Sequence, residues 1–394
     1  MGLEMANNNQ KMMKQDVFDV IIAGGGLAGL ISAIELSKSG LNVMLIEKKS
    51  YPFHKVCGEY VSNEVKPYLK RLGVDFEQLA PSTINKLRVS TLDGNKNIYS
   101  PLTMGGFGIS RYKFDNHLFE LLNKEKAVVL TNTRVKSIDY QDNIFTVKLD
   151  NNNIILSKIV IGSYGKRDML DKQLSRDFIN SKTGYMGVKY HIKTNYPENE
   201  IGLDNFKEGY CGISKIEEDK YCLCYLSKRS NMDEYKTLKQ MEEQVLYKNS
   251  ILKSVFKNSD FLFEKPEVIN EISFAAKAPV VNHILMCGDT AGMITPLCGN
   301  GMAMAIHSSK ILSEYIISAQ IKSDKIISSE KRNYIEKSYA QKWNLIFVRR
   351  IYWGRKLQYF AGKPLFTNAL LGMAAHLPKL KKRMINLTHG ETIH

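Results

Sequence analysis

A glycine-rich turn near the start of the chain has the residue types that bind a pyrophosphate. Residues 24–29 read Gly-Gly-Gly-Leu-Ala-Gly, which is the spacing G-x-G-x-x-G. In this pattern the first glycine permits a tight turn, the second lets backbone approach phosphates, and the third lets a helix pack closely on a strand. Glu47 lies 18 residues after Gly29, at the end of an apolar run, where a carboxylate can accept hydrogen bonds from ribose hydroxyls. The pattern predicts a dinucleotide site.

A second glycine-rich segment lies some 260 residues further along the chain. Residues 284–292 read Ile-Leu-Met-Cys-Gly-Asp-Thr-Ala-Gly, and residues 299–303 read Gly-Asn-Gly-Met-Ala. Asp289 follows a predicted strand, where it can accept a hydrogen bond from a polyol. A helix predicted from Asn300 can stabilise, through its N-terminus, negative charge that develops on a reduced flavin ring. NAD and FAD share the first motif, so this second segment favours FAD.

The thiol of Cys57 has a chemical context in the sequence. It lies in Lys-Val-Cys-Gly, residues 55–58, on the loop predicted after the second strand. A thiol pKa near 8.5 keeps the group mostly protonated at neutral pH, so Cys57 can donate the proton that reduction of a C=C bond needs. The alternative is a small buried hydrophobic residue. Cys222 and Cys224 share one face of a predicted strand, but no second pair or His cluster accompanies them, so we expect no metal site.

Hydrophobic periodicity indicates which elements position these residues. Residues 18–23 and 42–47 read as buried strands and residues 27–39 as the helix between them, which makes a β-α-β unit with parallel strands. Residues 184–226 resemble an antiparallel sheet. Further expected elements are short strands at 153–156 and 158–162 and helices at 232–249, 300–317 and most of 330–377.

These elements predict an α/β fold. We expect a Rossmann-type FAD-binding domain, an inserted antiparallel-sheet substrate domain and a helical C-terminal tail. The expected boundaries are 16–180 and 272–320 for the two parts of the FAD-binding domain, 181–271 for the substrate domain and 321–394 for the basic helical tail.

Together, the two glycine-rich motifs resemble those of FAD-dependent oxidoreductases that include geranylgeranyl reductases, aromatic hydroxylases and flavin halogenases. The resemblance runs from about residue 16 to residue 309. It implies that Arg111 lies near the pyrophosphate and ribityl chain, that the backbone of Val135 meets the adenine, and that residues 299–302 meet the isoalloxazine edge. The residues that the resemblance assigns to FAD are Gly24, Gly26, Leu27, Ala28, Gly29, Glu47, Lys48, Arg111, Val135, Asp289, Gly299, Asn300, Gly301 and Met302.

Departures from the motifs separate the branches of this family. The aromatic hydroxylases carry an Asp-Gly pair where this chain has Tyr164 and Gly165, and the halogenases carry a W-x-W-x-x-P signature that this chain lacks. Residues 55–58 match the K-x-C-G segment of the geranylgeranyl reductases, although that branch's Y-x-W-x-F-P substrate motif is not intact here. The resemblance favours reduction of C=C bonds in a lipophilic polyprenoid or polyene-like substrate. The alternatives are an FAD-dependent monooxygenase acting on an aromatic or lipophilic substrate, and an electron-transfer flavoprotein without an organic substrate.

The electron donor is left open by the sequence. A second G-x-G-x-x-G is missing, so we expect either NAD(P)H that binds transiently against the FAD domain or a separate reduced electron carrier. Residues 1–16 are polar, and no window approaches the ~20 apolar residues of a spanning helix, so we expect a cytoplasmic protein.

Positive charge is concentrated at the end of the chain. The formal net charge is +15, and residues 342–394 hold 10 Lys and Arg against one Glu. No nucleic-acid-binding motif accompanies this charge, so we expect no nucleic-acid partner. The segment is either a packed helical subdomain with a solvated basic face or a surface for peripheral docking on an anionic membrane or a carrier protein. The aromatic and basic residues behind the second reading are Trp343, Phe347, Arg349, Arg350, Trp353, Arg355, Lys356, Tyr359, Phe360, Lys363, Phe366, Lys379, Lys381, Lys382 and Arg383.

Overall fold

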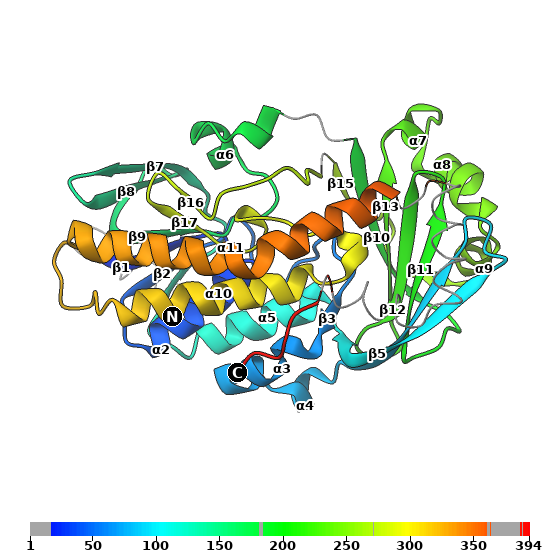
Figure 1. Ribbon diagram of the computed structural model, residues 1–394, viewed down its shortest axis with the longest axis horizontal. Coiled ribbons are helices and arrows are strands. Elements are labelled where there is room, and N and C mark those ends of the chain that lie inside the picture. The colour runs from blue at the N-terminus through cyan, green and yellow to red at the C-terminus, as the bar shows by residue number, and fades with distance from the viewer. Residues whose placement is uncertain (1–16, 181–183, 271, 361–362, 364–386, 388) are drawn as a thin grey trace.

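The computed structural model describes residues 17–180, 184–270, 272–360, 363, 387 and 389–394. Two sheets stand side by side in it, and long helices run along one side of the molecule (Figure 1). The first sheet has the strand order β16-β17-β9-β1-β2-β6, with β7 and β8 attached beyond β9. Its strands are β1 (Phe18–Ala23), β2 (Val43–Ile46), β6 (Val128–Leu130), β7 (Val135–Gln141), β8 (Ile144–Leu149), β9 (Ile154–Gly162), β16 (Val280–Val281) and β17 (Ile284–Met286).

The predicted β-α-β unit forms the centre of this first sheet. Every residue of β1 and β2 is buried, as expected for parallel strands that are covered on both faces, and the two strands pair in parallel. Helix α2 (Leu27–Lys38) connects them and is itself buried at almost every position, because α5 (Arg111–Leu122) and α10 (Gly301–Ser318) pack against it. The fold class and the first motif's strand-turn-helix context are therefore confirmed.

The second sheet is mainly antiparallel and has the order β14-β10-β13-β12-β11-β4-β5-β3, with β15 also paired to β10. It draws on two stretches of the chain, because β3, β4 and β5 join it in addition to strands from the expected substrate domain. β11 pairs with β4 in parallel. The strands are β3 (Tyr60–Ser62), β4 (Ser82–Ser90), β5 (Asn97–Gly108), β10 (Tyr185–Lys193), β11 (Glu200–Phe206), β12 (Gly209–Lys215), β13 (Tyr221–Lys228), β14 (Asp260–Phe261) and β15 (Glu267–Asn270).

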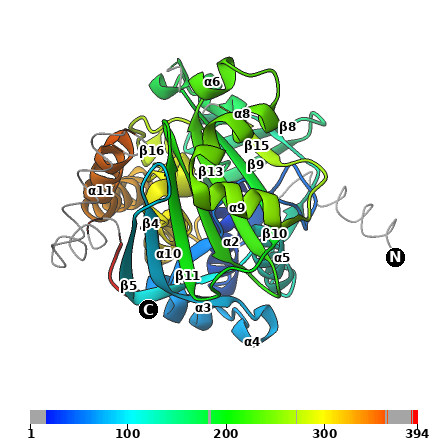
Figure 2. The same cartoon turned by 90° about the vertical axis from the view of Figure 1, so that its right-hand side faces the viewer.

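Short helices α8 and α9 cover the outer face of this second sheet (Figure 2). Helix α7 lies beside α8 next to β13, whereas α2, α5 and α10 lie with the first sheet, and α11 extends along the outside of α10 (Figure 1). The helices are α2, α3 (Lys66–Leu72), α4 (Phe76–Leu79), α5 (Arg111–Leu122), α6 (Met169–Gln173), α7 (Ser230–Asp233), α8 (Leu238–Val245), α9 (Ser250–Asn258), α10 (Gly301–Ser318) and α11 (Ser329–Phe360), with single 3₁₀ turns at Asn63–Val65, Asp177–Asn180, Leu246–Lys248, η4 (Gly288–Thr290) and η5 (Pro296–Cys298).

Two expectations about these elements were wrong. The strands expected at 153–156 and 158–162 are one strand, β9, which pairs with β8 at one end and with β1 at the other. The single helix expected over 232–249 is divided between α7, α8 and a 3₁₀ turn, because Thr237 begins a new helix by accepting a hydrogen bond from the N–H of Gln240. Among the residues described, no helix is both long enough and apolar enough to cross a bilayer.

Candidate active site

Residues from both sheets line a cavity of about 880 Å³. Its polar part lies against the glycine-rich motifs of the first sheet, and its apolar part is lined by the second sheet. Of the fifteen residues that the sequence assigned to FAD or to catalysis, thirteen line it: Gly24, Gly26, Leu27, Ala28, Glu47, Lys48, Cys57, Arg111, Val135, Asp289, Gly299, Gly301 and Met302. Gly29 and Asn300 do not.

The three motif glycines occupy positions that a side chain would disturb in different ways. Gly24 has φ +106°, which L-residues rarely adopt, and a Cβ on Gly29 would lie 2.0 Å from the carbonyl oxygen of Gly24. Glycine at position 24 allows the tight turn, and glycine at position 29 allows α2 to pack closely against that turn. At Gly26 the nearest atom to an added Cβ is Lys55 Nζ at 3.5 Å, so the backbone there faces open space. The cradle therefore fits a pyrophosphate at the N-terminus of α2.

Glu47 supports this turn through hydrogen bonds to backbone. Its Oε2 accepts from the N–H of Gly25 at 2.8 Å and its Oε1 from the N–H of Lys49 at 3.1 Å. The side chain is almost wholly buried, yet it lines the cavity, and a carboxylate retains lone pairs for further donors such as ribose hydroxyls. The neighbouring Lys48 lines the cavity as well and pairs with Asp168 at 3.3 Å.

Two cations lie over the glycine turn. Arg111 forms a bidentate pair with Asp115, with both N···O distances 2.7 Å, and Lys55 Nζ lies 3.4 Å from the same carboxylate. Burial lowers the pKa of the Lys55 ammonium, although Asp115 opposes this effect. Because these two partly exposed cations share one carboxylate, they retain positive charge that an anion would complement. The position of Arg111 agrees with its expected place near a pyrophosphate. The sequence reasoning did not assign Lys55 a phosphate-binding role, although the K-x-C-G segment marked its position.

The second motif forms the opposite wall of this polar part. A Cβ on Gly288 would lie 2.9 Å from the Cβ of Ala28, so η4 approaches α2 closely only because residue 288 is glycine. Gly299, with φ +63°, precedes the first turn of α10, and Gly301 begins that helix at the cavity. The helix N-terminus can therefore stabilise negative charge there. The side chain of Asn300 is buried away from the cavity, 3.5 Å from the carboxylate of Glu64.

Cys57 lies on the loop between the two sheets and is half-buried at the cavity wall. The backbone N–H of Glu59 donates to its sulfur at 3.4 Å. Two side chains from the second sheet hold this loop: the thiol of Cys222 donates to the carbonyl of Cys57 at 3.3 Å, and Lys189 Nζ donates to the carbonyl of Lys55 at 3.1 Å. The loop that carries the thiol is therefore held against strands β10 and β13 of the second sheet.

Glu59 lies at the centre of these contacts, and its side chain has no exposed surface. Lys189 Nζ lies 2.5 Å from Oε1, which also accepts from the N–H of Arg111 at 2.8 Å, and His191 Nε2 donates to Oε2 at 2.6 Å. Burial alone raises the pKa of a carboxyl group, but the charge of Lys189 and the hydrogen bond from His191 outweigh burial and lower the pKa of Glu59 to about 2. Glu59 is therefore ionised at neutral pH.

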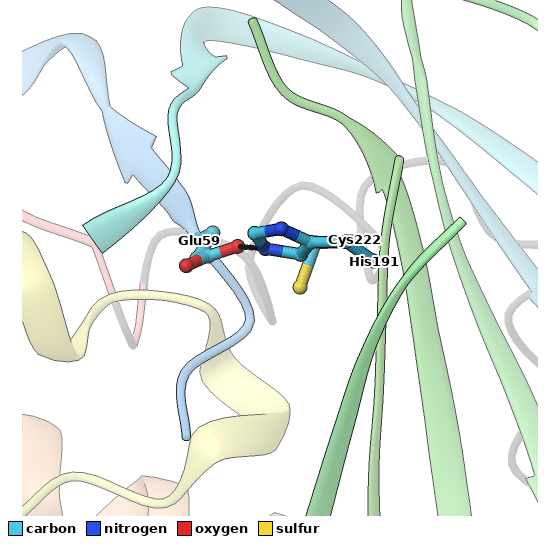
Figure 3. Close-up of side chains that lie close together, drawn as sticks. All are labelled: Glu59, His191 and Cys222. Carbon is cyan, nitrogen blue, oxygen red and sulfur yellow. Dashed lines mark hydrogen bonds and ion pairs between the residues drawn. The ribbon is translucent and has the colours of Figure 1, made fainter. Parts of the chain in front are cut away.

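Glu59, His191 and Cys222 also present three metal-binding atoms within 4.8 Å of one another. Figure 3 shows them pointing together from the loop and from two strands of the second sheet. However, the ammonium of Lys189 occupies the same carboxylate and would repel a divalent cation. We interpret the cluster as a buried ion pair with hydrogen bonds that holds the loop before β3 against the second sheet. Sequence reasoning missed it, although Lys189 and His191 stand out as polar residues at alternate positions of an apolar strand.

The part of the cavity lined by the second sheet is apolar. Strands β4, β5, β11 and β12 line it, and α11 contributes its last two turns. The apolar side chains here are Leu87, Val89, Ile98, Leu102, Ile201, Leu203, Tyr210, Leu226, Ile272, Met293, Leu357 and Phe360. No sequence motif marked these residues, because they come from strands that meet only in the folded sheet.

A scan against protein-family models matches residues 17–320 to the FAD binding domain. The chain belongs to this family. Its cofactor is therefore FAD, and the protein is an FAD-dependent oxidoreductase, as the sequence resemblance implied. The glycine cradle, the two cations and the N-terminus of α10 fit a flavin dinucleotide, and contact of Gly26 with its pyrophosphate stays a prediction.

Curated relatives and solved structures resemble the chain over most of its length. It is 26 % identical over 347 residues to the digeranylgeranylglycerophospholipid reductase of Methanosarcina acetivorans, covering 84 % of this chain and 81 % of that protein. The flavin-dependent brominase Bmp2 superposes with a TM-score of 0.73 at 18 % identity, covering 95 % of this chain and 93 % of the brominase. PqsL, a probable FAD-dependent monooxygenase from Pseudomonas aeruginosa, superposes with a TM-score of 0.70 at 14 % identity, covering 91 % of this chain and all of that one. The two structural likenesses show the fold alone.

Proposed function

We propose that this protein reduces C=C bonds of a lipophilic, polyprenoid or polyene-like substrate. The observation that carries the proposal is the apolar part of the 880 Å³ cavity, which adjoins the flavin motifs and is lined by strands of the second sheet. An elongated apolar chain fits such a space, whereas a small polar substrate would leave its walls without contacts. The similarity to the digeranylgeranylglycerophospholipid reductase of Methanosarcina acetivorans supports the same class of substrate.

The reaction adds one hydride and one proton across the double bond. When bound and reduced, FAD supplies the hydride. The side chains of β4, β11 and β12 orient the apolar chain and exclude water. The thiol of Cys57 donates the proton to the second carbon, and solvent restores that proton after turnover. Lys189, Glu59 and Cys222 act as positioning residues, because they hold the loop that carries Cys57.

The electrons come from NAD(P)H or from a reduced electron carrier, and we propose that either donor binds only transiently. The sequence has one G-x-G-x-x-G, and its loop is the one that fits the FAD pyrophosphate. Anaerobic mixing of the FAD-loaded protein with NADH, with NADPH and with a reduced ferredoxin separates these donors. Bleaching of the flavin absorbance by one of them within the turnover time identifies the donor.

The second candidate is an FAD-dependent monooxygenase, favoured by the fold shared with PqsL and with the brominase. The two reactions differ in their need for oxygen and in the mass of the product. Incubation with polyprenoid and polyene lipids under strict anaerobiosis, followed by mass spectrometry, tests the proposal. A product that gains two hydrogens for each reduced bond supports the reductase, and a product formed only in air that carries an added oxygen atom supports the monooxygenase. Rapid flavin reoxidation by a quinone with no change in any lipid supports the third reading, an electron-transfer flavoprotein.

A further inference from the structure

Helix α11 has one face packed on the protein and one face whose side chains are largely exposed, although Lys363 lies 3.5 Å from the centre of the Tyr359 ring. The packed face repeats every three or four residues, and it includes Trp343 and Phe347, which are 3 % and 0 % exposed. The sequence left open whether these aromatic residues pack within a helical subdomain or dock on a membrane. Phe347 packs edge-on against His307 of α10, and Trp343 packs against Gly292. A Cβ on Gly292 would lie 2.6 Å from the Trp343 ring.

The opposite face of α11 exposes apolar side chains at helical spacing. Leu345 is 77 % exposed, Val348 50 %, Tyr352 52 % and Tyr359 62 %. The intervals of three, four and seven residues place all four on one side of the helix. An unbroken row of exposed apolar and aromatic residues over four turns is unlike the scattered apolar residues of an ordinary surface.

Basic residues flank this row. Lys342, Arg349 and Lys356 are exposed, and residues 342–360 contain five Lys and Arg and no Asp or Glu. Lys356 lies 5.6 Å from the centre of the Tyr352 ring. We call these seven residues, Lys342, Leu345, Val348, Arg349, Tyr352, Lys356 and Tyr359, the α11 outer face.

We propose that the α11 outer face docks on the surface of an anionic lipid bilayer, with the helix lying in the plane of the interface. Apolar side chains would enter the acyl boundary, tyrosine hydroxyls would stay at the headgroups, and the long basic side chains would reach lipid phosphates. A second copy of this chain fits less well, because a symmetric contact centred on this face would oppose cations to cations with no carboxylate between residues 342 and 360.

Docking in this orientation has a consequence for substrate access, and this part rests on the proposed function. Leu357 and Phe360, in the last two turns of α11, line the catalytic cavity. The helix that would lie on the bilayer is therefore also a wall of the cavity. Docking would therefore bring one wall of the cavity to the bilayer that holds a lipophilic substrate.

Co-sedimentation of the FAD-loaded protein with vesicles tests the docking without any substrate. Vesicles of phosphatidylglycerol mixed with phosphatidylcholine are compared with vesicles of phosphatidylcholine alone, at low and high salt. The test variant reverses three charges, Lys342→Glu, Arg349→Glu and Lys356→Glu. The matched control reverses three exposed lysines on α8 and α9, Lys239, Lys253 and Lys257, to Glu. Flavin absorbance and circular dichroism confirm that each variant folds.

We expect wild-type protein and the control variant to sediment with the anionic vesicles, and the partition coefficient of the test variant to fall by about a hundredfold. Tryptophan fluorescence gives a second readout, because Trp353 is 37 % exposed beside the outer face while Trp343 is buried, so docking should shift the emission to the blue. Equal loss in both triple variants, or no sedimentation of wild-type protein, would overturn the proposal. The proposal would also be overturned if wild-type protein formed a dimer in solution, Leu345→Glu dissociated that dimer, and the protein bound no vesicles. Because no lipid reduction is measured, failure here leaves the proposed reaction standing.

Discussion

Replacing Glu59 by glutamine tests the buried ion pair that holds the loop before β3 against strand β10 of the second sheet. The substitution keeps the shape of the side chain and removes its negative charge. Lys189, which has no exposed surface, then remains buried without the carboxylate that neutralises it. Breaking one partner out of a buried ion pair costs about 3–5 kcal/mol of folding free energy.

The pKa of Glu59 gives an independent value for the contribution of its charge to the free energy of unfolding. Each unit of pKa change corresponds to about 1.4 kcal/mol. A fall from 4.5 to about 2 therefore corresponds to a contribution of about 3 kcal/mol from the ionised form of Glu59. A carboxyl group whose pKa is lower in the folded protein than in the unfolded chain stabilises the fold when the pH is above its unfolded pKa. That stabilisation is lost as the pH falls through the folded pKa. The contribution should thus be complete at pH 7 and decline between about pH 5 and pH 2.

Urea unfolding followed by circular dichroism measures this difference, with Glu264→Gln as a control at an exposed carboxylate. At pH 7 we expect Glu59→Gln to lower the free energy of unfolding by about 3 kcal/mol and the control to change it by less than about 0.5 kcal/mol. The gap between wild type and Glu59→Gln should narrow as pH falls toward 2. A variant as stable as wild type at pH 7, or a gap that widens in acid, would refute the argument that Glu59 is an ionised partner of Lys189.

The remaining predictions concern FAD binding, catalysis and substrate length. Gly26→Ala should leave the free energy of unfolding of the FAD-free protein nearly unchanged and weaken FAD binding in a fluorescence titration. Gly29→Ala should lower both the free energy of unfolding and the affinity for FAD, because its Cβ would lie 2.0 Å from a carbonyl oxygen. Equal losses of stability in the two variants would contradict these roles. Cys57→Ser should retain bound FAD and its reduction by the donor but lose product formation, and unchanged turnover would remove Cys57 from the mechanism. Leu203→Trp should fill part of the apolar cavity and lower kcat/KM by about tenfold for long chains relative to short ones; an equal effect on both lengths would show that the chain does not lie along β11.

Local patterns predicted the part of the fold that holds the dinucleotide. The apolar runs of β1 and β2, the periodicity of α2 and the glycine spacing all concern residues close together in sequence, so they could be interpreted without knowing the tertiary structure. The cavity position of Arg111 followed from the family resemblance, and its pairing with Asp115 four residues away is local as well.

The second sheet and its contacts were much less predictable. The parallel pairing of β4 with β11 joins Val89 to Leu203, more than a hundred residues apart, and neither strand carries a signal that names its partner. The same holds for the ion pair of Glu59 with Lys189, which are separated by 130 positions. In α11 the composition showed that aromatic and basic residues alternate, but only packing against α10 decided that Trp343 faces inward and Tyr352 outward. The final basic cluster, Lys379, Lys381, Lys382 and Arg383, and Phe366 lie outside the described residues, so the expectation for them stays a prediction.

Anaerobic turnover followed by mass spectrometry tests the central claim most directly. The FAD-loaded protein, reduced by its donor in the absence of oxygen, is incubated with a panel of polyprenoid and polyene lipids, and Cys57→Ser serves as the matched control. We predict products that gain two hydrogens per reduced double bond with wild-type protein and none with the variant. Lipids that stay unchanged without oxygen and acquire an oxygen atom in air would contradict the claim.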